Sequence, residues 1–342
     1  MQIPTRNCKL WAALIGLIFI LITPEVRADS GNFAVTAPAA GLEKKKHRLV
    51  ETDFTFSAGY RQDSLDWNIA GDLFPGYNVN VLSELTWDDL ESYQVKFQGS
   101  LIIPNIIALH GYADYGWIFD GDNQDSDFAG DDRTLEFSRS NNSADDDDVW
   151  DVSLAVGYPF RTGRRVIGTI TPLVGYSYHE QNLNMTDGVQ TIATPGVTPP
   201  LGPFGGLDSS YDTEWHGPWL GIDLNFRAAA IKTVAHRFET FISYEYHWVD
   251  YEAEADWNLR DDLRHPKSFT HDADGNGWIL RTGLNFILHR NVAVNFTYEY
   301  QDWSTDSGTD KIFFANGQTA ETRLNEVNWT SYSLGLGMSV RF

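Results

Sequence analysis

The sequence predicts an all-β protein, a ten-stranded antiparallel transmembrane β-barrel behind an N-terminal signal peptide. Apolar and polar residues alternate with a period of two along most of the chain, and helical periodicity is almost absent. The alternating segments reach about 10 residues or more, which suits a tilted membrane strand. The face opposite the apolar one carries Glu239, Glu245, His247, Arg281 and Glu299. A close-packed soluble core would not accept these groups unpaired.

The N-terminus is typical of a secretory signal peptide over residues 1–28. Arg6 and Lys9 form a short basic region, and the apolar run Leu10–Ile22 follows it. This run is short for a bilayer span, which needs about 20 residues. Small residues at the −3 and −1 positions predict cleavage after Ala28.

The mature chain is expected to have two parts. Residues 29–52 are small, polar and locally basic, so we predict a periplasmic N-terminal extension there. The barrel is then predicted over residues 53–342. The chain has a single cysteine, Cys8, which precedes the apolar run. One cysteine excludes a disulfide scaffold, a cysteine-rich zinc site or an iron–sulfur cluster.

The charge balance narrows the choice of partners. The formal net charge is −22, while aromatic residues make up 14% of the chain. Nucleic acid is not an expected partner, because phosphate binding needs clustered Lys and Arg. Acidic disordered chains are poor in aromatic residues, so this chain is expected to fold. We expect a monomer with no organic cofactor.

The clearest predicted strand is the last one, where an apolar face from Tyr332 to Phe342 alternates with Ser, Gly and Arg. The aromatic Phe342 at the end of the chain resembles the signal by which bacterial barrels engage the barrel-assembly machinery. The predicted strands are Asp53–Leu65, Val81–Ile102, Ile106–Phe119, Val149–Phe160, Val166–Gln181, Trp215–Arg227, Arg237–Trp257, Gly277–Leu288, Asn291–Ser304 and Trp329–Phe342. Their even number fits single-chain bacterial barrels, and predicts a location in a cell outer membrane of Gram-negative type.

Links between the predicted strands alternate in length, and long links of such barrels are extracellular. The long links hold the acid, with eleven Asp or Glu and two Arg between Asp120 and Asp148. We expect this acid to be a solvated face. We hypothesise that Ca²⁺ or other divalent cations at the lipopolysaccharide surface offset the repulsion between these carboxylates. Outer-membrane lipid and lipopolysaccharide are the expected partners.

Aromatic residues at strand ends predict interfacial girdles rather than a carbohydrate platform. The residues in question are Trp150, Tyr178, Trp215, Trp219, Tyr298 and Trp329. Inside the barrel, Glu239, Glu245 and His247 form either a catalytic group or, more often in such proteins, a plug of buried ion pairs with Arg281. A narrow ten-strand lumen argues against a general porin.

Two stretches contain oxygen ligands at suggestive spacings. Asp272, Asp274 and Asn276 match positions 1, 3 and 5 of a calcium loop, and Gly277 matches position 6. Position 12 is Gly283 rather than Glu, which leaves a weak Ca²⁺ site or a turn rich in Asp and Gly. Two further pairs, Asp120 with Asp122 and Asp125 with Asp127, provide another candidate divalent-cation site.

Three segments resemble omptins, a family of ten-stranded outer-membrane endopeptidases of aspartic type. Ser83–Trp87 resembles the entry of the second strand, and Pro218–Ile222 resembles the sixth. Gly116–Asp122 looks like the Gly-x-x-x-Asp-x-Asp segment of the third strand. The resemblance implies an omptin-like barrel that activates a water molecule for attack on a peptide bond beside a basic residue.

The resemblance assigns the catalytic Asp pair to Asp120 and Asp122, and parity along the third strand predicts that both face the lumen. The opposing Asp-x-His dyad falls on Ala255 and Trp257, or on Asp256 and Asn258 after a one-residue slip. Neither register supplies a histidine. The nearest histidines, His265 and His271, are expected in the following loop and could replace the base if that loop folds back into the mouth.

A second resemblance is to a porin-like family named after a Protochlamydia outer-membrane protein. It rests on Glu254–Arg260, His265-Pro266 and Asp272–Gly275. Two functions therefore stay open. The first is a non-proteolytic surface barrel acting in adhesion, cation binding or limited transport. The alternative is an omptin-type aspartic endopeptidase that cleaves near basic residues.

Overall fold

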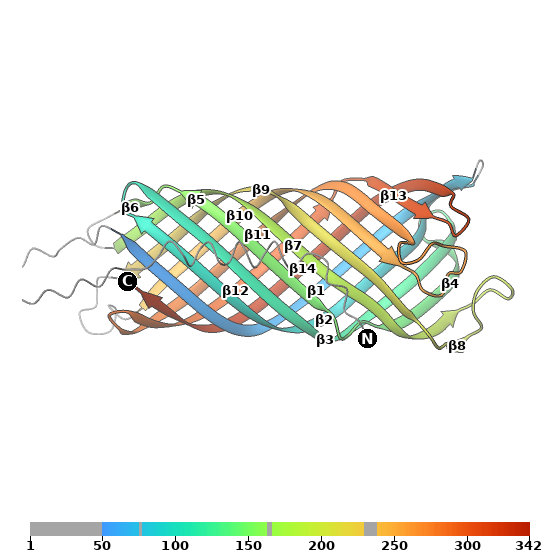
Figure 1. Cartoon of the computed structure of the whole chain (residues 1–342), viewed down its shortest axis with the longest axis horizontal. Coiled ribbons are helices and arrows are strands. Elements are labelled where there is room, and N and C mark those ends of the chain that lie inside the picture. Colours follow the sequence, from blue (N-terminus) through green and yellow to red (C-terminus); the bar gives the residue numbers. More distant parts are fainter. Residues whose placement is uncertain (1–49, 75–76, 163–165, 229–237) are drawn as a thin grey trace, which may run out of the picture. The chain divides into compact units, whose positions relative to one another are not determined.

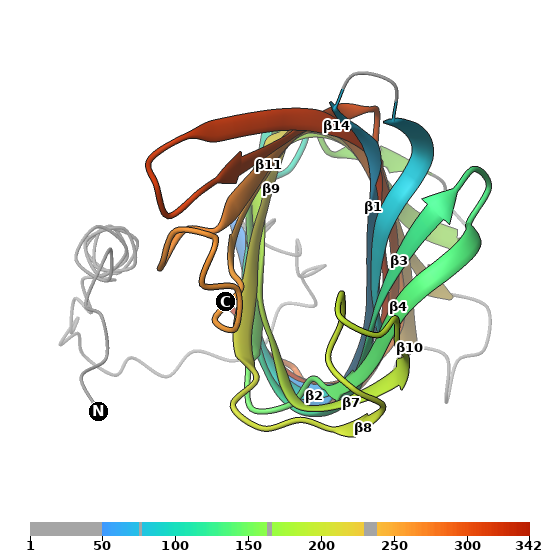
Figure 2. The same ribbon diagram turned by 90° about the vertical axis from the view of Figure 1, so that its right-hand side faces the viewer.

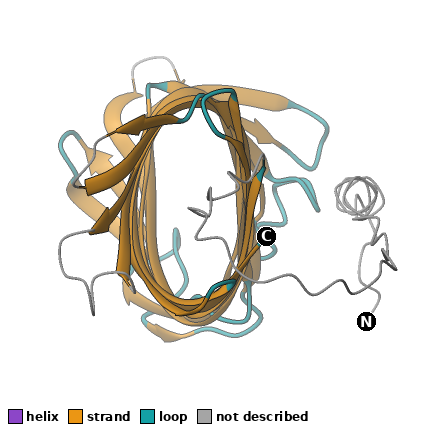
Figure 3. Ribbon diagram, turned by 90° about the vertical axis from the view of Figure 1, so that its left-hand side faces the viewer, coloured by secondary structure: helices purple, strands orange, loops and turns teal. Residues whose placement is uncertain are grey.

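The computed structural model describes residues 50–342 apart from 75–76, 163–165 and 229–237. The predicted signal peptide and nearly all of the predicted extension lie outside the described residues. Among the described residues, regular structure is entirely β (Figure 3). No described helix is long and apolar enough to cross a bilayer. The strands are β1 (Glu51–Phe74), β2 (Tyr77–Ile103), β3 (Ile107–Gly130), β4 (Thr134–Ser143), β5 (Asp148–Gly157), β6 (Phe160–Thr162), β7 (Val166–Ile192), β8 (Gly202–Pro203), β9 (Asp208–Ala228), β10 (Phe238–Asp256), β11 (Phe269–His289), β12 (Val292–Thr305), β13 (Gly308–Phe313) and β14 (Thr319–Arg341).

Ten long segments close into a barrel (Figure 1). Each pairs antiparallel with its neighbours in the order β1, β2, β3, β5, β7, β9, β10, β11, β12 and β14. Pairing of β14 with β1, from Asp53 opposite Arg341 to Ile69 opposite Leu324, completes the ring. A closed sheet leaves no edge strand, so backbone groups are satisfied within the wall. The ten-stranded antiparallel fold predicted from the sequence is thereby confirmed.

The strands extend further than predicted at one end of the barrel, the end that carries the long links. Both β2 and β7 have 27 residues, whereas a tilted membrane strand needs about 9–11. Segments expected as acidic loops, such as Asp120–Gly130, continue as strand, and β4, β8 and β13 add to the wall there. Charged and polar residues occupy this extension because it lies outside the hydrocarbon. We call it the extracellular extension, since it carries the long links.

Between the extracellular extension and the end with the short links, the wall presents an apolar face to the outside. Its outward side chains are 38–63% exposed although they are apolar, and hydrocarbon is the solvent that suits them. We define the apolar belt by Phe56, Phe97, Leu109, Leu154, Val156, Val174, Leu220, Ile222, Ile242, Leu284, Phe296, Leu334, Leu336 and Met338. The predicted apolar face of the last strand is part of this belt.

The inner face is polar in the belt and aromatic above it. The barrel has an oval cross-section (Figure 2), so opposite walls approach each other. Trp215, Trp219 and Trp329 are 0–2% exposed and lie in the interior. Their predicted place in an outer girdle is wrong, because they stand at inward positions of β9 and β14. Trp150, Tyr178 and Tyr298 do lie on outward positions, as predicted.

Candidate functional site

Buried charges fill the barrel interior at the level of the apolar belt. Arg61 binds Asp63 through Nε at 2.8 Å and Nη2 at 3.0 Å. Its Nη1 donates to Asp151 at 2.7 Å and lies 3.5 Å from Asp114. Asp151 also lies 2.8 Å from Nδ1 of His179. One guanidinium therefore ties together β1, β3, β5 and, through the histidine, β7.

A second set of pairs continues across the interior. Lys96 Nζ lies 3.0 Å from Asp114 and 2.9 Å from Glu299. Arg281 pairs with Glu299 and, at 2.6 Å, with Glu245. These side chains are all less than one-tenth exposed. This confirms the predicted plug of ion pairs around Arg281, and charges so paired recover much of the cost of burial.

We call this set the lumen network. Its members share burial in the interior and belong to eight strands of the ring. They are Arg61, Asp63, Lys96, Asp114, Asp151, His179, Glu245, His247, Arg281 and Glu299. One predicted member differs: Glu239 binds Arg341 at the end of the barrel that carries the short links, where Asp53 binds Arg341 as well.

An aromatic layer closes the interior directly above the lumen network. Trp303 stacks on Trp329 with ring centres 5.2 Å apart, and Trp215 lies 6.1 Å from Trp303. Trp87 of β2 stacks on Tyr211 of β9 at 5.2 Å. Strands β2 and β9 stand on opposite parts of the ring, so these rings meet across the lumen. The layer consists of Trp67, Trp87, Tyr211, Trp215, Tyr251, Trp303 and Trp329.

His271 lies inside the barrel rather than in a loop. It belongs to β11, and its ring packs against Trp67 with centres 4.8 Å apart. Nδ1 lies 2.7 Å from the Tyr211 hydroxyl, and Nε2 lies 3.2 Å from Asp310 of β13. The predicted loop position is wrong because β11 begins eight residues earlier than expected, at Phe269. With Nδ1 hydrogen-bonded to Tyr211, Nε2 beside Asp310 and no exposed side-chain surface, this histidine has a structural role.

Asp120 and Asp122 do not face the lumen. Both are exposed and alternate with buried Gly121 and Asn123, and Asp122 pairs across strands with outward Asp88. The pairing of β2 with β3 is irregular between Asp88 and Ser92. One extra residue on β3, between Ile118 and Gly121, reverses which of its side chains point inward. The parity prediction for this pair is therefore wrong. The two carboxylates lie on the outer wall.

The positions expected for the dyad carry other groups. Ala255 is buried in the interior, and Trp257 packs against the core. Asn258 is a structural residue, since its amide donates to the Gly206 carbonyl and accepts from Ser209. The slipped register does produce an acid–histidine pair: Asp256 lies 2.5 Å from Nδ1 of His265 in the β10–β11 link. The carboxylate raises the pKa of His265.

In the extracellular extension, the inward carboxylates of β3 are Asp125 and Asp127. Asp125 pairs across strands with buried Leu85 and Ser140, which fixes its direction. Burial raises the pKa of Asp125 well above its usual range, and the charge of Asp127 raises it further, while Arg260 lowers it. Since Asp120 and Asp122 face outward, the four aspartates cannot surround one ion, as the candidate cation site required.

Asp272, Asp274 and Asn276 lie within β11, not in a turn or calcium loop. Successive residues on one face of a strand are about 6.5 Å apart, so their oxygens do not converge as in a loop. Among the described residues, no group of three or more acidic, histidine or cysteine side chains is arranged to hold a metal ion. The loop geometry predicted here is wrong.

Asp272 instead belongs to a row of carboxylates on the outer wall. It stands opposite Glu252 of β10, which stands opposite Glu214 of β9, which stands opposite Glu180 of β7. A second row above it contains Asp148, Asp212 and Glu254. We call these seven residues the carboxylate ladder. Like charges directly opposite each other destabilise a sheet, so the ladder stores repulsion.

The pKa values near the ladder record this repulsion. Burial raises the pKa of Asp212 to about 6, and Glu180, Glu254 and Asp148 raise it as well. Burial, with Asp148 and Asp212 beside it, raises the pKa of Asp147 to about 7. Lys267 binds Glu254, and it is the one described cation that pairs with the ladder.

Part of the lumen network has a signal in the sequence. Arg61, Lys96 and His179 stand at polar positions of alternating strands, which is the signal that identified Arg281. The ladder has no such signal in a single strand. It arises only when four strands are set in register.

A family model described as "Protochlamydia outer membrane protein" matches residues 55–342. No curated protein matches the sequence significantly.

Among solved structures, the outer membrane protease OmpT from Escherichia coli is similar with a TM-score of 0.67 and 12% identity. The match covers 85% of this chain and 97% of OmpT. OprG of Pseudomonas aeruginosa also matches at 12% identity, over 85% of this chain and 95% of its own, with a TM-score of 0.29. Ail of Yersinia pestis matches at 12% identity, over 85% and 99%, with a TM-score of 0.24. At 12% identity, the similarity to OmpT shows the fold alone.

Replacing Arg281 by Met tests the lumen network. The change leaves Glu245 and Glu299 with fewer partners in the interior, and breaking a buried pair costs about 3–5 kcal/mol. Urea unfolding of the barrel in lipid vesicles should show a loss of this size. The triple variant Arg281→Met, Glu245→Gln and Glu299→Gln should recover most of it. Equal losses in both variants would show that Arg281 stabilises the barrel by packing rather than by charge pairing.

Proposed function

Since the chain belongs to the Protochlamydia outer membrane protein family and lies in the outer membrane, we propose that it is a non-proteolytic surface barrel that binds divalent cations on its extracellular wall. The observation that carries this proposal is the carboxylate ladder. Four carboxylates stand in one cross-strand row on four adjacent strands, β7, β9, β10 and β11.

The closed interior supports an external role. The lumen network occupies the barrel at belt level, and rings from opposite walls touch above it. A water-filled path for solutes needs a wider barrel, as in porins with 16–18 strands. Limited transport through the lumen is therefore the weakest of the three surface roles. Adhesion is compatible with cation binding, because a bridging cation can join two acidic surfaces.

The ladder has the chemistry of a hard-cation surface. Ca²⁺ takes carboxylate oxygens as ligands and tolerates flexible geometry. Directly opposed side chains have Cβ atoms about 4.5–5.5 Å apart, which lets two carboxylates approach one ion. No described cation pairs with Glu180, Glu214, Glu252 or Asp272. A divalent cation would remove the repulsion that the sequence places there.

Ca²⁺ should stabilise the protein at pH 8 and much less at pH 5. The raised pKa values of Asp212 and Asp147 mean that the folded state holds protons that the unfolded state has lost. Without cation, stability therefore falls as the pH rises from about 4 towards 7. Bound Ca²⁺ replaces those protons. It raises the free energy of unfolding by about 2.7 kcal/mol when the free ion concentration exceeds its Kd about 100-fold. Thermal unfolding in detergent micelles, with and without Ca²⁺, measures both effects.

The matched control separates the ladder from general acidity. Glu214→Gln with Glu252→Gln should lower Ca²⁺ affinity about tenfold in calorimetric titration, which is about 1.4 kcal/mol. Glu136→Gln should leave it unchanged, because Arg139 already balances that carboxylate at 2.7 Å. Unchanged affinity in the ladder variant would rule the ladder out as the binding surface.

An omptin-type endopeptidase is the second candidate, and one observation favours it. His265 is oriented by Asp256 at 2.5 Å and is partly exposed, which suits a general base. Arg260 of the same link interacts with inward Asp125 and Asp127, so this link reaches the mouth of the barrel. An acid pair and a histidine would then face a shared mouth from different strands.

A peptide assay distinguishes the two candidates. The non-proteolytic proposal expects no cleavage of a dibasic fluorogenic peptide by refolded protein with lipopolysaccharide. Cleavage that His265→Ala or Asp125→Asn reduces about 100-fold or more, as for loss of a general base, would establish the protease. Asp122→Asn is the control, since that carboxylate points away from the mouth.

A further inference from the structure

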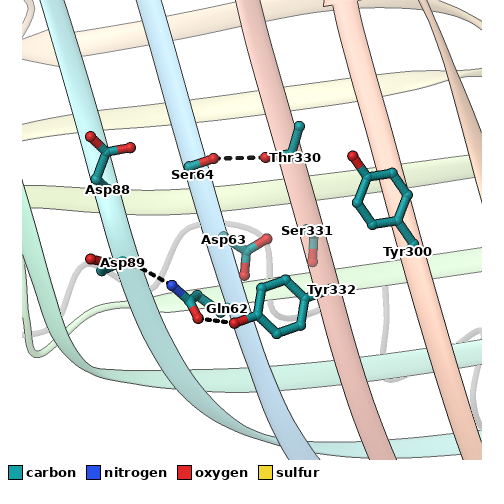
Figure 4. A pocket seen from close by; sticks show the side chains of 9 residues that line it. All are labelled: Gln62, Asp63, Ser64, Asp88, Asp89, Tyr300, Thr330, Ser331 and Tyr332. Carbon is teal, nitrogen blue, oxygen red and sulfur yellow. Dashed lines mark hydrogen bonds between the residues drawn. The ribbon is translucent and has the colours of Figure 1, made fainter.

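A small pocket opens on the outer wall of the barrel, far along the ring from the carboxylate ladder. Its volume is about 170 Å³, and β1, β2, β12 and β14 form it (Figure 4). Its lining consists of Gln62, Asp63, Ser64, Asp88, Asp89, Tyr300, Thr330, Ser331 and Tyr332. Pockets for drug-sized ligands measure roughly 300–1,000 Å³, so this one suits a single small group. We call it the girdle pocket.

Hydrogen bonds within the wall fix the shape of the pocket. The Gln62 amide donates to Asp89 and accepts from the Tyr332 hydroxyl. Ser64 and Thr330 bond each other at 2.7 Å. Asp89 has a φ of 53°, an uncommon conformation for a residue with a side chain, and it stands at the irregularity in the β2 register. The irregularity places two successive carboxylates, Asp88 and Asp89, on the outer face.

The groups left open in the pocket are acceptors. No described residue forms a hydrogen bond or ion pair with Asp88, and only one oxygen of Asp89 is engaged. The rings of Tyr300 and Tyr332 stand opposite each other on neighbouring strands across from these carboxylates (Figure 4). A ligand for this pocket must carry several donors and positive charge. Aromatic faces beside carboxylates are a recurrent arrangement for ammonium groups.

The position of the pocket indicates the source of the ligand. Tyr332 is followed on the same face by Leu334 and Leu336 of the apolar belt, and exposed Tyr93 lies at a similar level of β2. Tyrosines at this level mark the boundary between hydrocarbon and headgroups. A group bound here would sit among lipid headgroups, with its acyl chains along the belt below.

We propose that the girdle pocket binds the ammonium headgroup of a membrane lipid, with Asp88 and Asp89 as its counter-charges and Tyr300 and Tyr332 as its aromatic side. The electrostatics support this assignment. Burial raises the pKa of Asp88, and the charges of Asp89 and Asp122 raise it further, so a cation bound beside it relieves a standing repulsion.

Native mass spectrometry of the full-length mature barrel in neutral detergent tests the proposal. The probes are phosphatidylethanolamine, the same lipid with its amine acetylated, phosphatidylglycerol with matched chains, and soluble ethanolamine. We expect phosphatidylethanolamine to bind at least tenfold more tightly than the acetylated lipid or phosphatidylglycerol. Weaker binding of soluble ethanolamine identifies the lipid, rather than any amine, as the ligand.

Asp88→Asn should reduce phosphatidylethanolamine binding about tenfold, and Asp88→Lys should abolish it. Asp120→Asn removes one charge from the same wall outside the pocket, and it should have little effect. The expected loss should also be larger at pH 8 than at pH 5, because the raised pKa of Asp88 favours its neutral form as the pH falls. Equal binding of the acetylated lipid, equal losses in Asp88→Asn and Asp120→Asn, or a pocket that responds to Ca²⁺ alone would each overturn the proposal.

Discussion

The pairing of three buried cations with the carboxylates around them is the interaction on which the rest of this barrel depends. Arg61, Lys96 and Arg281 reach carboxylates on different strands, and removing any partner leaves an uncompensated charge in a low-dielectric interior. Together with the closed hydrogen-bonded ring, these pairs hold opposite walls of an oval barrel at a fixed separation. That separation lets Trp87 meet Tyr211, and Trp215 meet Trp303, across the lumen.

Because side chains fill the interior, the groups that a ligand can reach lie on the outer wall. Within the bilayer that wall is apolar, as lipid requires. Above it, the strands continue for a length comparable to the membrane span and carry most of the acid. The ladder on β7 to β11 and the girdle pocket on β12 to β2 are both products of register, since strand pairing brings together carboxylates that are distant in sequence. Each surface has more negative charge than its neighbours balance, which is why cationic partners suit both.

The parts of this structure that lipid constrains could be predicted from the sequence. Hydrocarbon admits only apolar outward residues, so Leu334, Leu336 and Met338 had to alternate with small or polar ones, and Glu245 and His247 had to face inward. Above the membrane that constraint ends. Both faces of Asp120–Gly130 are polar, and the segment has no alternation to distinguish strand from loop. An extra residue of β3 at Phe119 and Asp120 then reverses parity, so the alternation of the preceding residues predicts the wrong face for Asp120 and Asp122. Trp215 and Trp329 fit a girdle and a core equally well by residue type, and only tertiary packing separates the two.

The central claim, that the lumen is closed and function lies outside, has a direct test in single-channel recording from planar bilayers. The account predicts no ion conductance for the native barrel. It predicts steady conductance once Trp303→Ala and Trp329→Ala remove the stacked pair of the aromatic layer and Arg281→Met, Glu245→Gln and Glu299→Gln remove the ion pairs below it. Trp248→Ala and Trp278→Ala on the outer face should produce none. Open-channel currents from the native protein, unchanged by loss of Trp303 and Trp329, would contradict it.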